Sequence, residues 1–355
     1  SGSMTSMMAV LVAACPSALA LAAPATSVAA IAVATRFGVL VKSTAFMEEL
    51  TRVDTLLLDK TGTVTEGSLQ VVGVVCAPDV ETEEAERLAG MLAGASSHPV
   101  SRAIHRLRRE AGSKAAAVNE VAGKGVEGEI DGRMHRLGRS SLHSEAGATP
   151  FEEPEHDGPV VGLSRDVDFL AWILLADTVR EDAASSLNQL RNMGLTKQML
   201  VSGDRAALVE EVAAELAVDE AVGDALPAQK LEVVHRQQRE GRRVLMVGDG
   251  INDALALKAA NVGVAIDGGN TDVALASADL ILSVQRLDRL VYMIRLAREA
   301  RKVMNINFGI ALSVSLVFIT LASAGLVGPV ATAVIHNVDA LLIIMNSARL
   351  LSFRG

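Results

Sequence analysis

Long apolar stretches lie near both ends of the 355-residue chain. The first extends from Met7 to Ala34, the second over about Ile306 to Ala324, and the third over about Val330 to Met345. A helix needs about 20 mostly apolar residues to cross the hydrocarbon core of a bilayer. The pattern therefore predicts three membrane-spanning helices, the last two joined as a hairpin across Gly325 to Pro329.

Basic residues flank these runs. Arg36 and Lys42 follow the first run, Arg349 and Arg354 follow the third, and the second is preceded by Arg295, Arg298, Arg301 and Lys302. With three crossings all these flanks lie on one side, and the positive-inside rule places them and the long middle segment in the cytosol. We expect a multi-pass protein of the plasma membrane, in contact with lipid. A signal peptide is the alternative for the first run, which however lacks a basic n-region.

Short apolar runs in the middle of the chain each end at a polar motif. Asp59 follows the run Val53–Leu58, Ser202 follows Gln198–Val201, and Gly248 follows Val244–Val247. Such runs are typical of buried parallel strands. Helical patterns alternate with them at Arg180–Met193, Ala206–Leu216 and Gln229–Arg239. The alternation predicts an α/β fold with a doubly wound parallel sheet, in which ligands bind at the carboxyl ends of the strands.

The segment 64–172 interrupts this alternation, and we interpret it as an inserted α+β domain. It contains helical patterns at Thr82–Gly94 and Val100–Ala111, strand patterns near Val118 and Met134, and a loop at Ala148–Gly158. The predicted domains are a transmembrane helix with a stalk at 4–46, the parallel-sheet domain at 47–63 and 173–290, the inserted domain at 64–172, and a stalk with a helical hairpin at 291–355.

Composition and charge exclude some classes of function. Half of the residues are hydrophobic, only 3% are aromatic, and the net charge is −9. A general nucleic-acid binder needs a surplus of Lys and Arg, so no nucleic-acid partner is expected. The two cysteines, Cys15 and Cys76, are too few for a disulfide framework and favour a reducing compartment.

The polar residues at the strand ends have the chemistry for phosphoryl transfer. A carboxylate such as Asp59 can accept a phosphoryl group if a cation offsets the repulsion between the two anions. Asp249 and the nearby Asp253 can hold Mg²⁺ for this purpose, and Lys230 can add a fixed positive charge. Thr63 and the backbone amides of these turns can donate hydrogen bonds to phosphoryl oxygens. Each feature alone has a simpler interpretation, since a strand-end Asp is commonly a turn or cap residue and a Lys such as Lys230 is commonly solvated.

Together, and in this order, the motifs resemble those of the P-type ATPase family. The residues that carry the resemblance are Asp59, Lys60, Thr61, Gly62 and Thr63, then Ser202, Gly203 and Asp204, and then Gly248-Asp249-Gly250-Ile251-Asn252-Asp253. The resemblance implies a haloacid dehalogenase-like phosphorylation domain with ATP as substrate, Asp59 as phosphoryl acceptor, and the other motif residues and Lys230 around it. It implies Mg²⁺ held by Asp59, Thr61 and Asp249. Thr61 also stands where soluble relatives have a general-acid Asp, which should lengthen the life of the phosphoenzyme.

The inserted domain resembles the nucleotide-binding domain of the heavy-metal-transporting branch, type IB. Ser97-His98-Pro99 and Gly123-Lys124-Gly125 match the His-Pro and Gly-x-Gly signatures of that branch. There the His orients the adenine end of ATP and the glycines let the backbone approach it, with Gly138 as a further candidate. Alone, a His-Pro pair is a helix start with Pro near its first position, and Gly-Lys-Gly is a turn. Ala93 departs from the branch, which commonly has a Glu about five residues before the His.

The first apolar run contains Cys15-Pro16-Ser17, which resembles the Cys-Pro-x metal motif of heavy-metal pumps. Pro16 removes a backbone hydrogen bond, so the thiolate lies beside an unwound turn. In the third run, His336 is an ionisable group at membrane depth, where such groups are usually functional. One thiolate with imidazole and carboxylate suits Zn²⁺, Co²⁺ or Cd²⁺, with Mn²⁺ conceivable, rather than Cu⁺. The alternatives are a buried Cys in a kinked helix and a His336 that snorkels to the interface.

Parts of the family's full architecture do not occur in this sequence. It has no Thr-Gly-Glu actuator loop and no Cys-x-x-Cys metal-binding domain. We therefore expect a fragment or one half of a split pump, with the missing N-terminal part as its partner, slow dephosphorylation, and no transport by this chain alone. The leading interpretation is an ATP-driven exporter of a divalent transition metal. The alternatives are a soluble-type phosphatase of the same superfamily and a non-enzymatic, nucleotide-binding regulatory subunit of a pump.

Overall fold

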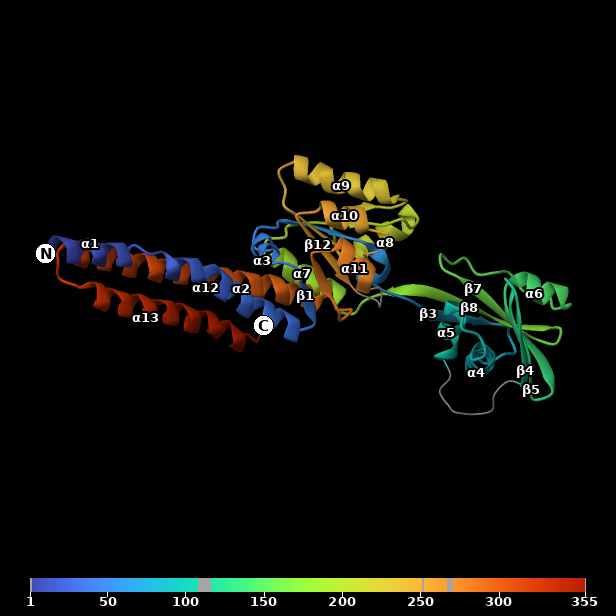
Figure 1. Ribbon diagram of the computed structural model, residues 1–355. Helices are drawn as coiled ribbons and strands as arrows, with labels where there is room; N and C mark the ends of the chain where they lie inside the picture. Colours follow the sequence, from blue (N-terminus) through green and yellow to red (C-terminus); the bar gives the residue numbers. More distant parts are fainter. Residues whose placement is uncertain (1, 108–115, 251, 267–270, 355) are drawn as a thin grey trace. The chain divides into compact units, whose positions relative to one another are not determined.

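The computed structural model describes residues 2–107, 116–250, 252–266 and 271–354, which belong to two compact units. The first unit is built from both ends of the chain, residues 1–64 and 181–355, and the second from residues 65–180 (Figure 1). The second unit is thus an insertion into the first, as the interrupted alternation of strands and helices predicts.

A seven-stranded sheet forms the centre of the first unit. In spatial order its strands are β1 (Val39–Val41), β13 (Leu280–Leu282), β12 (Val262–Ile266), β11 (Val244–Gly248), β2 (Thr55–Leu58), β9 (Lys197–Val201) and β10 (Glu220–Val222). Neighbouring strands pair in parallel, except that β1 is antiparallel to β13. The predicted parallel sheet is confirmed, and the three predicted strands are β2, β9 and β11.

Helices connect the strands and shield the sheet. They are α3 (Thr44–Glu49), α7 (Ala183–Asn192), α8 (Ala206–Glu215), α9 (Pro227–Arg239), α10 (Ala254–Ala259) and α11 (Thr271–Ser277). Every residue of β2, β11 and β12 is buried, as expected for strands covered on both faces. Because these central strands are rigid and buried, the loops that follow them hold their polar side chains in fixed positions.

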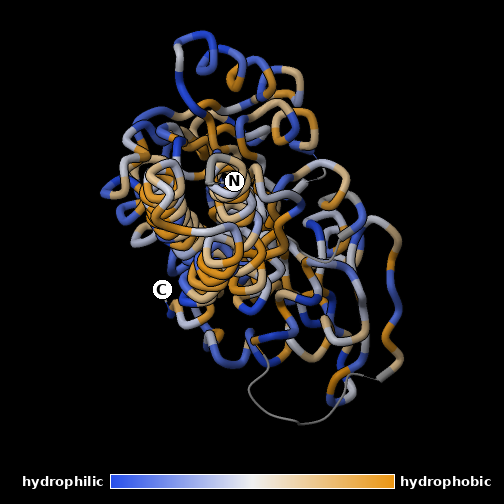
Figure 2. Tube along the Cα trace, turned by 60° about the vertical axis from the view of Figure 1, so that its left-hand side comes forward, coloured by the Kyte–Doolittle hydropathy of each residue, from blue (hydrophilic) through white to orange (hydrophobic). Residues whose placement is uncertain are grey.

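Three stretches of the first unit are long and apolar enough to cross a membrane: Met4–Arg36, Asp288–Ser323 and Pro329–Ser352. They form α1 (Gly2–Ala13), α2 (Ser17–Arg36), α12 (Asp288–Ser323), α13 (Pro329–Ala348) and a 3-10 turn (Arg349–Ser352). The helices pack against one another and are largely hydrophobic along their length, as the orange of the tube shows (Figure 2). Large apolar side chains such as Leu312, Leu316 and Val330 remain exposed. An exposed apolar surface of this kind suits contact with lipid.

The first stretch is interrupted at Cys15-Pro16, between α1 and α2. Pro16 has no backbone N–H and its ring obstructs a continuous helix, which is why α1 ends at Ala13 and α2 begins at Ser17. Pro24, in contrast, lies inside α2 without ending it. The unwound turn predicted at Pro16 is therefore present, and it exposes the Cys15 side chain.

The second unit is a six-stranded antiparallel sheet covered by helices. In spatial order its strands are β3 (Thr65–Cys76), β8 (Asp168–Val179), β7 (Val160–Arg165), β6 (Arg133–Gly138), β5 (Gly125–Ile130) and β4 (Ala116–Val121); the helices are α4 (Thr82–Ala93), α5 (Pro99–His105) and α6 (Ser140–Glu145). The unit extends to Arg180, beyond the predicted end at residue 172, because β8 pairs with β3 as far as Val179. Of the helix predicted over Val100–Ala111, residues 108–111 lie outside the described part of the chain.

Candidate functional site

The carboxyl ends of three adjacent strands bring the predicted phosphorylation motifs together. β2 lies between β9 and β11 and is parallel to both, so Asp59, Ser202 and Asp249 follow strands that end at the same edge of the sheet. The backbone N–H of Asp59 also donates to the carbonyl oxygen of Val247 on β11 (2.9 Å). Segments almost 200 residues apart in sequence thus converge on one site, as the strand pattern predicts.

Asp59 and Asp253 share one lysine at the centre of this site. The ammonium of Lys230 lies 2.6 Å from Asp59 Oδ1 and 2.7 Å from Asp253 Oδ1. All three side chains are buried, with at most 5% of each residue exposed. Burial, reinforced by the negative charge of Asp253, raises the pKa of Asp59 to about 7, although Lys230 opposes this rise. Lys230 keeps its charge because the two carboxylates raise its pKa despite burial.

A second cluster of side chains joins the turn after β2 to the turn after β9. Asp204 Oδ2 lies 2.8 Å from the ammonium of Lys60 and accepts hydrogen bonds from Thr61 Oγ1 (3.2 Å) and Ser202 Oγ (3.3 Å). Burial alone would raise the pKa of Asp204, but these contacts outweigh it and hold the pKa below its usual value. Gly203 lies between Ser202 and Asp204, within the same turn. Asp204 therefore joins the turn after β2 to the turn after β9.

The turn at 60–64, which follows Asp59, has open space at Gly62. Gly62 has a φ of +74°, which favours glycine, and an added Cβ there would meet nothing within 4 Å. Thr63, the next residue, is fully buried in the same turn. The open side of this turn is where a phosphoryl group could approach closely.

The donor set at the strand ends fits a Mg²⁺ ion. Burial raises the pKa of Asp253, and the negative charge of Asp249 adds to this rise while Lys230 opposes it. Asp253 Oδ2 is buried with no hydrogen-bond partner in the described part of the chain. Three carboxylates with one ammonium leave a net negative charge that a divalent cation would offset. No three acidic, His or Cys side chains among the described residues form a complete metal cage. Mg²⁺ does not require one, because it commonly keeps waters and binds one or two carboxylates together with substrate phosphates.

The second unit contains a cavity of about 380 Å³ that brings its predicted residues together. His98, Gly123, Gly125 and Gly138 all line it, and Pro99 begins the adjacent α5. The Nδ1 atom of His98 accepts a hydrogen bond from the N–H of Val100 (3.3 Å), so Nε2 is the ring nitrogen left for a ligand. The volume is within the usual range of about 300–1,000 Å³ for small-molecule sites.

The glycines that line this cavity are required for different structural reasons. A Cβ on Gly125 would lie 2.2 Å from the carbonyl oxygen of Leu137 and 2.6 Å from the Cα of Gly138, so β5 and β6 approach too closely for any side chain there. Gly123, with a φ of +72°, has open space around it. Gly125 and Gly138 thus shape the wall of the cavity, and Gly123 leaves room in it.

Sequence reasoning missed one acidic residue in this cavity. Glu120 lies on the wall and accepts a hydrogen bond from Ser96 Oγ (3.2 Å), which itself accepts from the N–H of His98 (3.2 Å). Ala93, by contrast, is fully buried in the apolar core of the unit. The carboxylate of Glu120 therefore reaches the cavity from β4, and no local sequence motif around Glu120 predicts this position.

In the membrane helices, the structure places two of the three predicted metal-binding residues in contact. The hydroxyl of Ser17, at the start of α2, is hydrogen-bonded to Nε2 of His336 on α13. Cys15 is exposed at the break just before α2. No group of three His, Cys, Asp or Glu side chains in the described ranges forms a metal site by itself. A site that joins Cys15 to His336 therefore stays a prediction.

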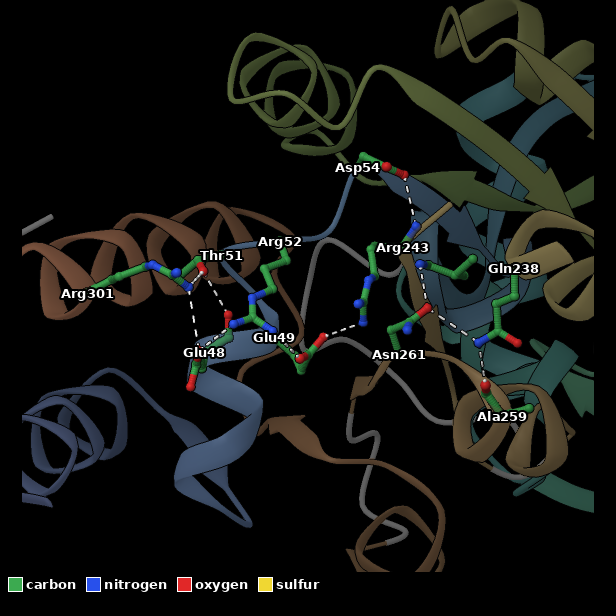
Figure 3. Close-up of polar contacts among 11 residues, drawn as sticks. Glu48, Glu49, Thr51, Arg52, Asp54, Gln238, Arg243, Ala259, Asn261 and Arg301 are labelled. Atoms are coloured by element: carbon green, nitrogen blue, oxygen red, sulfur yellow. Dashed lines mark hydrogen bonds and ion pairs between the residues drawn. The ribbon is translucent and has the colours of Figure 1, made fainter. Parts of the chain in front are cut away.

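A chain of polar contacts links α12 to the beginnings of β2 and β11 (Figure 3). Its contacts are Arg301 to Thr51 (3.0 Å), Arg52 to Glu48 (2.6 Å) and Glu49 (3.2 Å), Arg243 to Glu49 (3.1 Å), and the N–H of Arg243 to Asp54 (3.2 Å). Most of these side chains are partly exposed. The contacts join a helix that is long and apolar enough to span a membrane to the strands that carry the phosphorylation motifs.

Known proteins resemble the chain in both sequence and structure. A model of the family described as haloacid dehalogenase-like hydrolase matches residues 53–261. The nitrogen fixation protein FixI of Rhizobium leguminosarum bv. viciae is 37% identical over 348 residues, which cover 98% of this chain and 44% of that protein. A zinc-exporting P-type ATPase of Mycobacterium marinum is 34% identical over 365 residues, covering 99% of this chain and 50% of that protein.

A solved structure gives the same result. The crystal structure of a zinc-transporting PIB-type ATPase in the E2.Pi state has a TM-score of 0.75 at 32% identity, covering 95% of this chain and 56% of that one. The chain belongs to the haloacid dehalogenase-like hydrolase family. The relatives and the solved structure that it resembles over nearly its whole length are heavy-metal P-type ATPases. It spans about half the length of the curated relatives that it matches.

Proposed function

We propose that this chain carries the phosphoryl-transfer machinery of an ATP-driven heavy-metal pump, with Asp59 as the phosphoryl acceptor. The observation that supports this most directly is the buried Asp59–Lys230–Asp253 arrangement at the carboxyl ends of parallel strands. A buried cation between two carboxylates holds the acceptor in place and offsets its charge. Phosphoryl transfer depends mainly on such positioning and charge stabilisation.

In the proposed reaction, an oxygen of the Asp59 carboxylate attacks the γ-phosphorus of ATP. A new P–O bond forms, the bond between the γ-phosphorus and the bridging oxygen breaks, and ADP leaves. Lys230 stabilises the ionised form of Asp59, and Thr63 and Ser202 would orient phosphoryl oxygens. Mg²⁺, bound by Asp59, Thr61 and Asp249, would supply positive charge for the phosphoryl oxygens.

ATP is the proposed donor, with its adenosine part in the cavity of the second unit. His98 Nε2 and the open backbone at Gly123 would contact the base, while Lys124 and Arg139 on the cavity wall would attract the phosphates. Glu120 adds an acceptor for an amino group. These features support a nucleotide as the ligand of this cavity.

The membrane helices support transport of a metal ion as the purpose of this phosphorylation. Relatives are named as copper-, manganese- and zinc-exporting P-type ATPases. We assign the cargo of this chain to the divalent Zn²⁺, Co²⁺ or Cd²⁺ class, bound near Cys15, Ser17 and His336. Export from the cytosol across the plasma membrane, cytosolic placement of both units, and cooperation with an N-terminal part that carries an actuator loop belong to the same proposal.

The test uses the purified chain with γ-³²P-labelled ATP and Mg²⁺. We expect an acid-stable, hydroxylamine-sensitive label that Asp59→Asn abolishes, that Cys15→Ala retains, and that the exposed control Asp79→Asn leaves unchanged. Absence of label in the wild-type chain would favour a regulatory subunit. Rapid turnover of a simple phosphate ester would favour the phosphatase. We further expect slow loss of the label, which metal-stimulated turnover at the rate of a full pump would contradict.

A further inference from the structure

One of the two cations on the wall of the nucleotide cavity is already paired with a carboxylate. Lys124 and Arg139 both line this cavity. The ammonium of Lys124 lies 2.7 Å from Glu145 Oε1 and 2.6 Å from Glu145 Oε2, whereas Arg139 forms no ion pair with any described residue. Only one of the two positive charges is therefore free to attract the phosphates of a nucleotide.

The turn that carries Lys124 is fixed to the start of α6. The N–H of Lys124 donates to the carbonyl oxygen of Val121 (2.9 Å), which closes the turn between β4 and β5. The carbonyl oxygen of Lys124 accepts a hydrogen bond from the N–H of Arg139 (2.8 Å), the residue directly before α6. The backbone of Lys124 thus has a defined position relative to the helix that ends at Glu145.

A buried histidine anchors the same helix from its other side. Nε2 of His143 donates to the carbonyl oxygen of Gly138 (3.2 Å), and its Nδ1 accepts a hydrogen bond from the hydroxyl of Ser164 (2.8 Å). His143 is fully buried, and Glu145 follows it by two residues as the last residue of α6. The backbone at both ends of the ion pair is therefore set by the fold.

The ion pair is strong enough to reduce nucleotide binding and weak enough to be displaced. The side chains of Lys124 and Glu145 are 37% and 61% exposed. The usual free energy of an exposed pair corresponds to a preference of about 1.4- to 5-fold for the paired over the open form. A ligand that needs the open form binds in proportion to its population, so its affinity falls by about 2- to 6-fold.

We propose that Glu145 competes with the nucleotide phosphates for Lys124 and thereby sets how tightly the cavity holds a phosphorylated nucleotide. A polyphosphate brings several negative charges against the single charge of Glu145, so it opens the pair and takes over the ammonium. The inference rests on the proposed function, because it takes ATP as the ligand of the cavity. It deepens that function by naming a residue outside the cavity wall that regulates the same site.

The test measures binding of ATP and adenosine to the full chain in lipid nanodiscs, by displacement of a fluorescent ATP analogue at constant ionic strength. We expect Glu145→Gln to bind ATP about 2- to 6-fold more tightly than the wild type, because Lys124 is then always available. Adenosine, which has no phosphate, should bind to both equally. Lys124→Met should weaken binding of ATP but not of adenosine, and in its background Glu145→Gln should lose most of its gain.

The control is Glu129→Gln, which removes an exposed carboxylate of the same unit that does not line the cavity, and it should bind ATP like the wild type. Glu145→Asp keeps the carboxylate on a shorter side chain and should give a smaller gain. This second variant tests the contact even where Glu145→Gln does not fold, since binding of adenosine shows that the cavity is intact.

Three results would overturn the inference. They are unchanged ATP affinity in Glu145→Gln, an equal gain for adenosine, and an equal gain in the Lys124→Met background. A chain that labels at Asp59 but is insensitive to the Glu145 substitutions would refute this inference and leave the proposed function intact. A chain in which Glu145→Gln tightens ATP binding but Asp59 never labels would refute the proposed phosphoryl transfer alone.

Discussion

Buried carboxylates occur at two places in the first unit, and their surroundings differ. At the strand ends, Asp59 and Asp253 share the ammonium of Lys230 at 2.6 and 2.7 Å. In the helix bundle, neither oxygen of Asp339 has a hydrogen-bond partner among the described residues. A buried charge is tolerated when it is paired, and an unpaired one is retained at a cost that function must justify. The contrast separates carboxylates that share a buried ammonium from one whose oxygens have no hydrogen-bond partner in the described part of the chain.

Removing the counter-ion of the first site should produce the largest effect. Lys230→Met leaves two buried carboxyl groups facing each other, and breaking a buried pair in this way typically costs about 3–5 kcal/mol. We expect faster hydrogen exchange at the amides of β2 and β11, which report local opening of the sheet. We also expect complete loss of phosphorylation from ATP.

The matched control is Lys258→Met, which removes an exposed lysine from α10 and should change neither measurement. A second variant, Lys230→Met with Asp253→Asn, removes one of the facing carboxylates and should recover part of the protection in β2 and β11. Wild-type protection in Lys230→Met would show that the ammonium does not hold the site together, and the contrast with Asp339 would then disappear.

The pH dependence of stability gives a second test of the strand-end site. The folded pKa of Asp59 is raised from 3.8 to about 7, so across this range the folded state keeps a proton that the unfolded state has lost. Stability must therefore fall as pH rises through this window, by about 1.4 kcal/mol per pH unit at most for a fully buried group. Asp59→Asn cannot titrate and resembles the protonated acid.

The measurement compares thermal unfolding of the wild type and Asp59→Asn in chelator-containing, Mg²⁺-free buffer. The two proteins should be similar in stability near pH 4, and the wild type should become progressively less stable than the variant up to about pH 7. Above that pH the difference should stay constant. Parallel profiles across the whole range would show that burial does not shift the acceptor.

The sequence predicts the features of the strand-end site that follow from local patterns, and not those that follow from packing between distant segments. Asp59, Ser202 and Asp249 could be placed together because buried parallel strands are short apolar runs that share a carboxyl edge. The ion pair between Lys230 and Asp253 could not be predicted from the sequence, because it depends on how α9 packs over that edge of the sheet. Glu120 was missed for the same reason: its position follows from pairing between strands rather than from a local motif.

The membrane segment divides in the same way. The break at Pro16 follows from local backbone chemistry, and the sequence predicts it. The burial of Asp339 does not follow from local chemistry, because the hydropathy pattern shows only an acidic residue in an apolar run. That its oxygens have no hydrogen-bond partner among the described residues becomes visible only when α13 is packed against α2. The end of the inserted domain could not be predicted for the same reason. No local pattern indicates that β8 continues to Val179, because its length is set by pairing with β3.

Neutralising the second carboxylate should have a smaller effect, of the opposite sign. Asp339→Leu removes an unpartnered charge from the bundle, and we expect a gain in stability of about 1–2 kcal/mol, within the range seen when buried charged groups are replaced by apolar ones. Detergent titration of the chain in the absence of metal measures the gain, with Asn337→Leu as the control on the exposed side of α13. A loss of stability would show that Asp339 already has a partner.

The smallest effect should come from charges that are neither buried nor unpartnered. Arg243 and Glu49 form an ion pair at 3.1 Å, with 48% and 27% of their side chains exposed (Figure 3). Exposed pairs contribute about 0.2–1 kcal/mol and are screened by salt. We expect a double-mutant cycle of Arg243→Gln and Glu49→Gln to give a coupling free energy in this range, measured from exchange of the β11 amides.

Salt distinguishes this pair from the strand-end site. The Arg243–Glu49 coupling should shrink at high ionic strength, as should that of the more exposed pair Arg239–Glu232 on α9, whereas the penalty of Lys230→Met should persist because buried charges are poorly screened. A salt-insensitive coupling above about 2 kcal/mol would place this pair with the buried charges rather than with ordinary surface pairs. In that case the chain of contacts from Arg301 to β11 would act as a rigid connection between the membrane helix and the phosphorylation motifs.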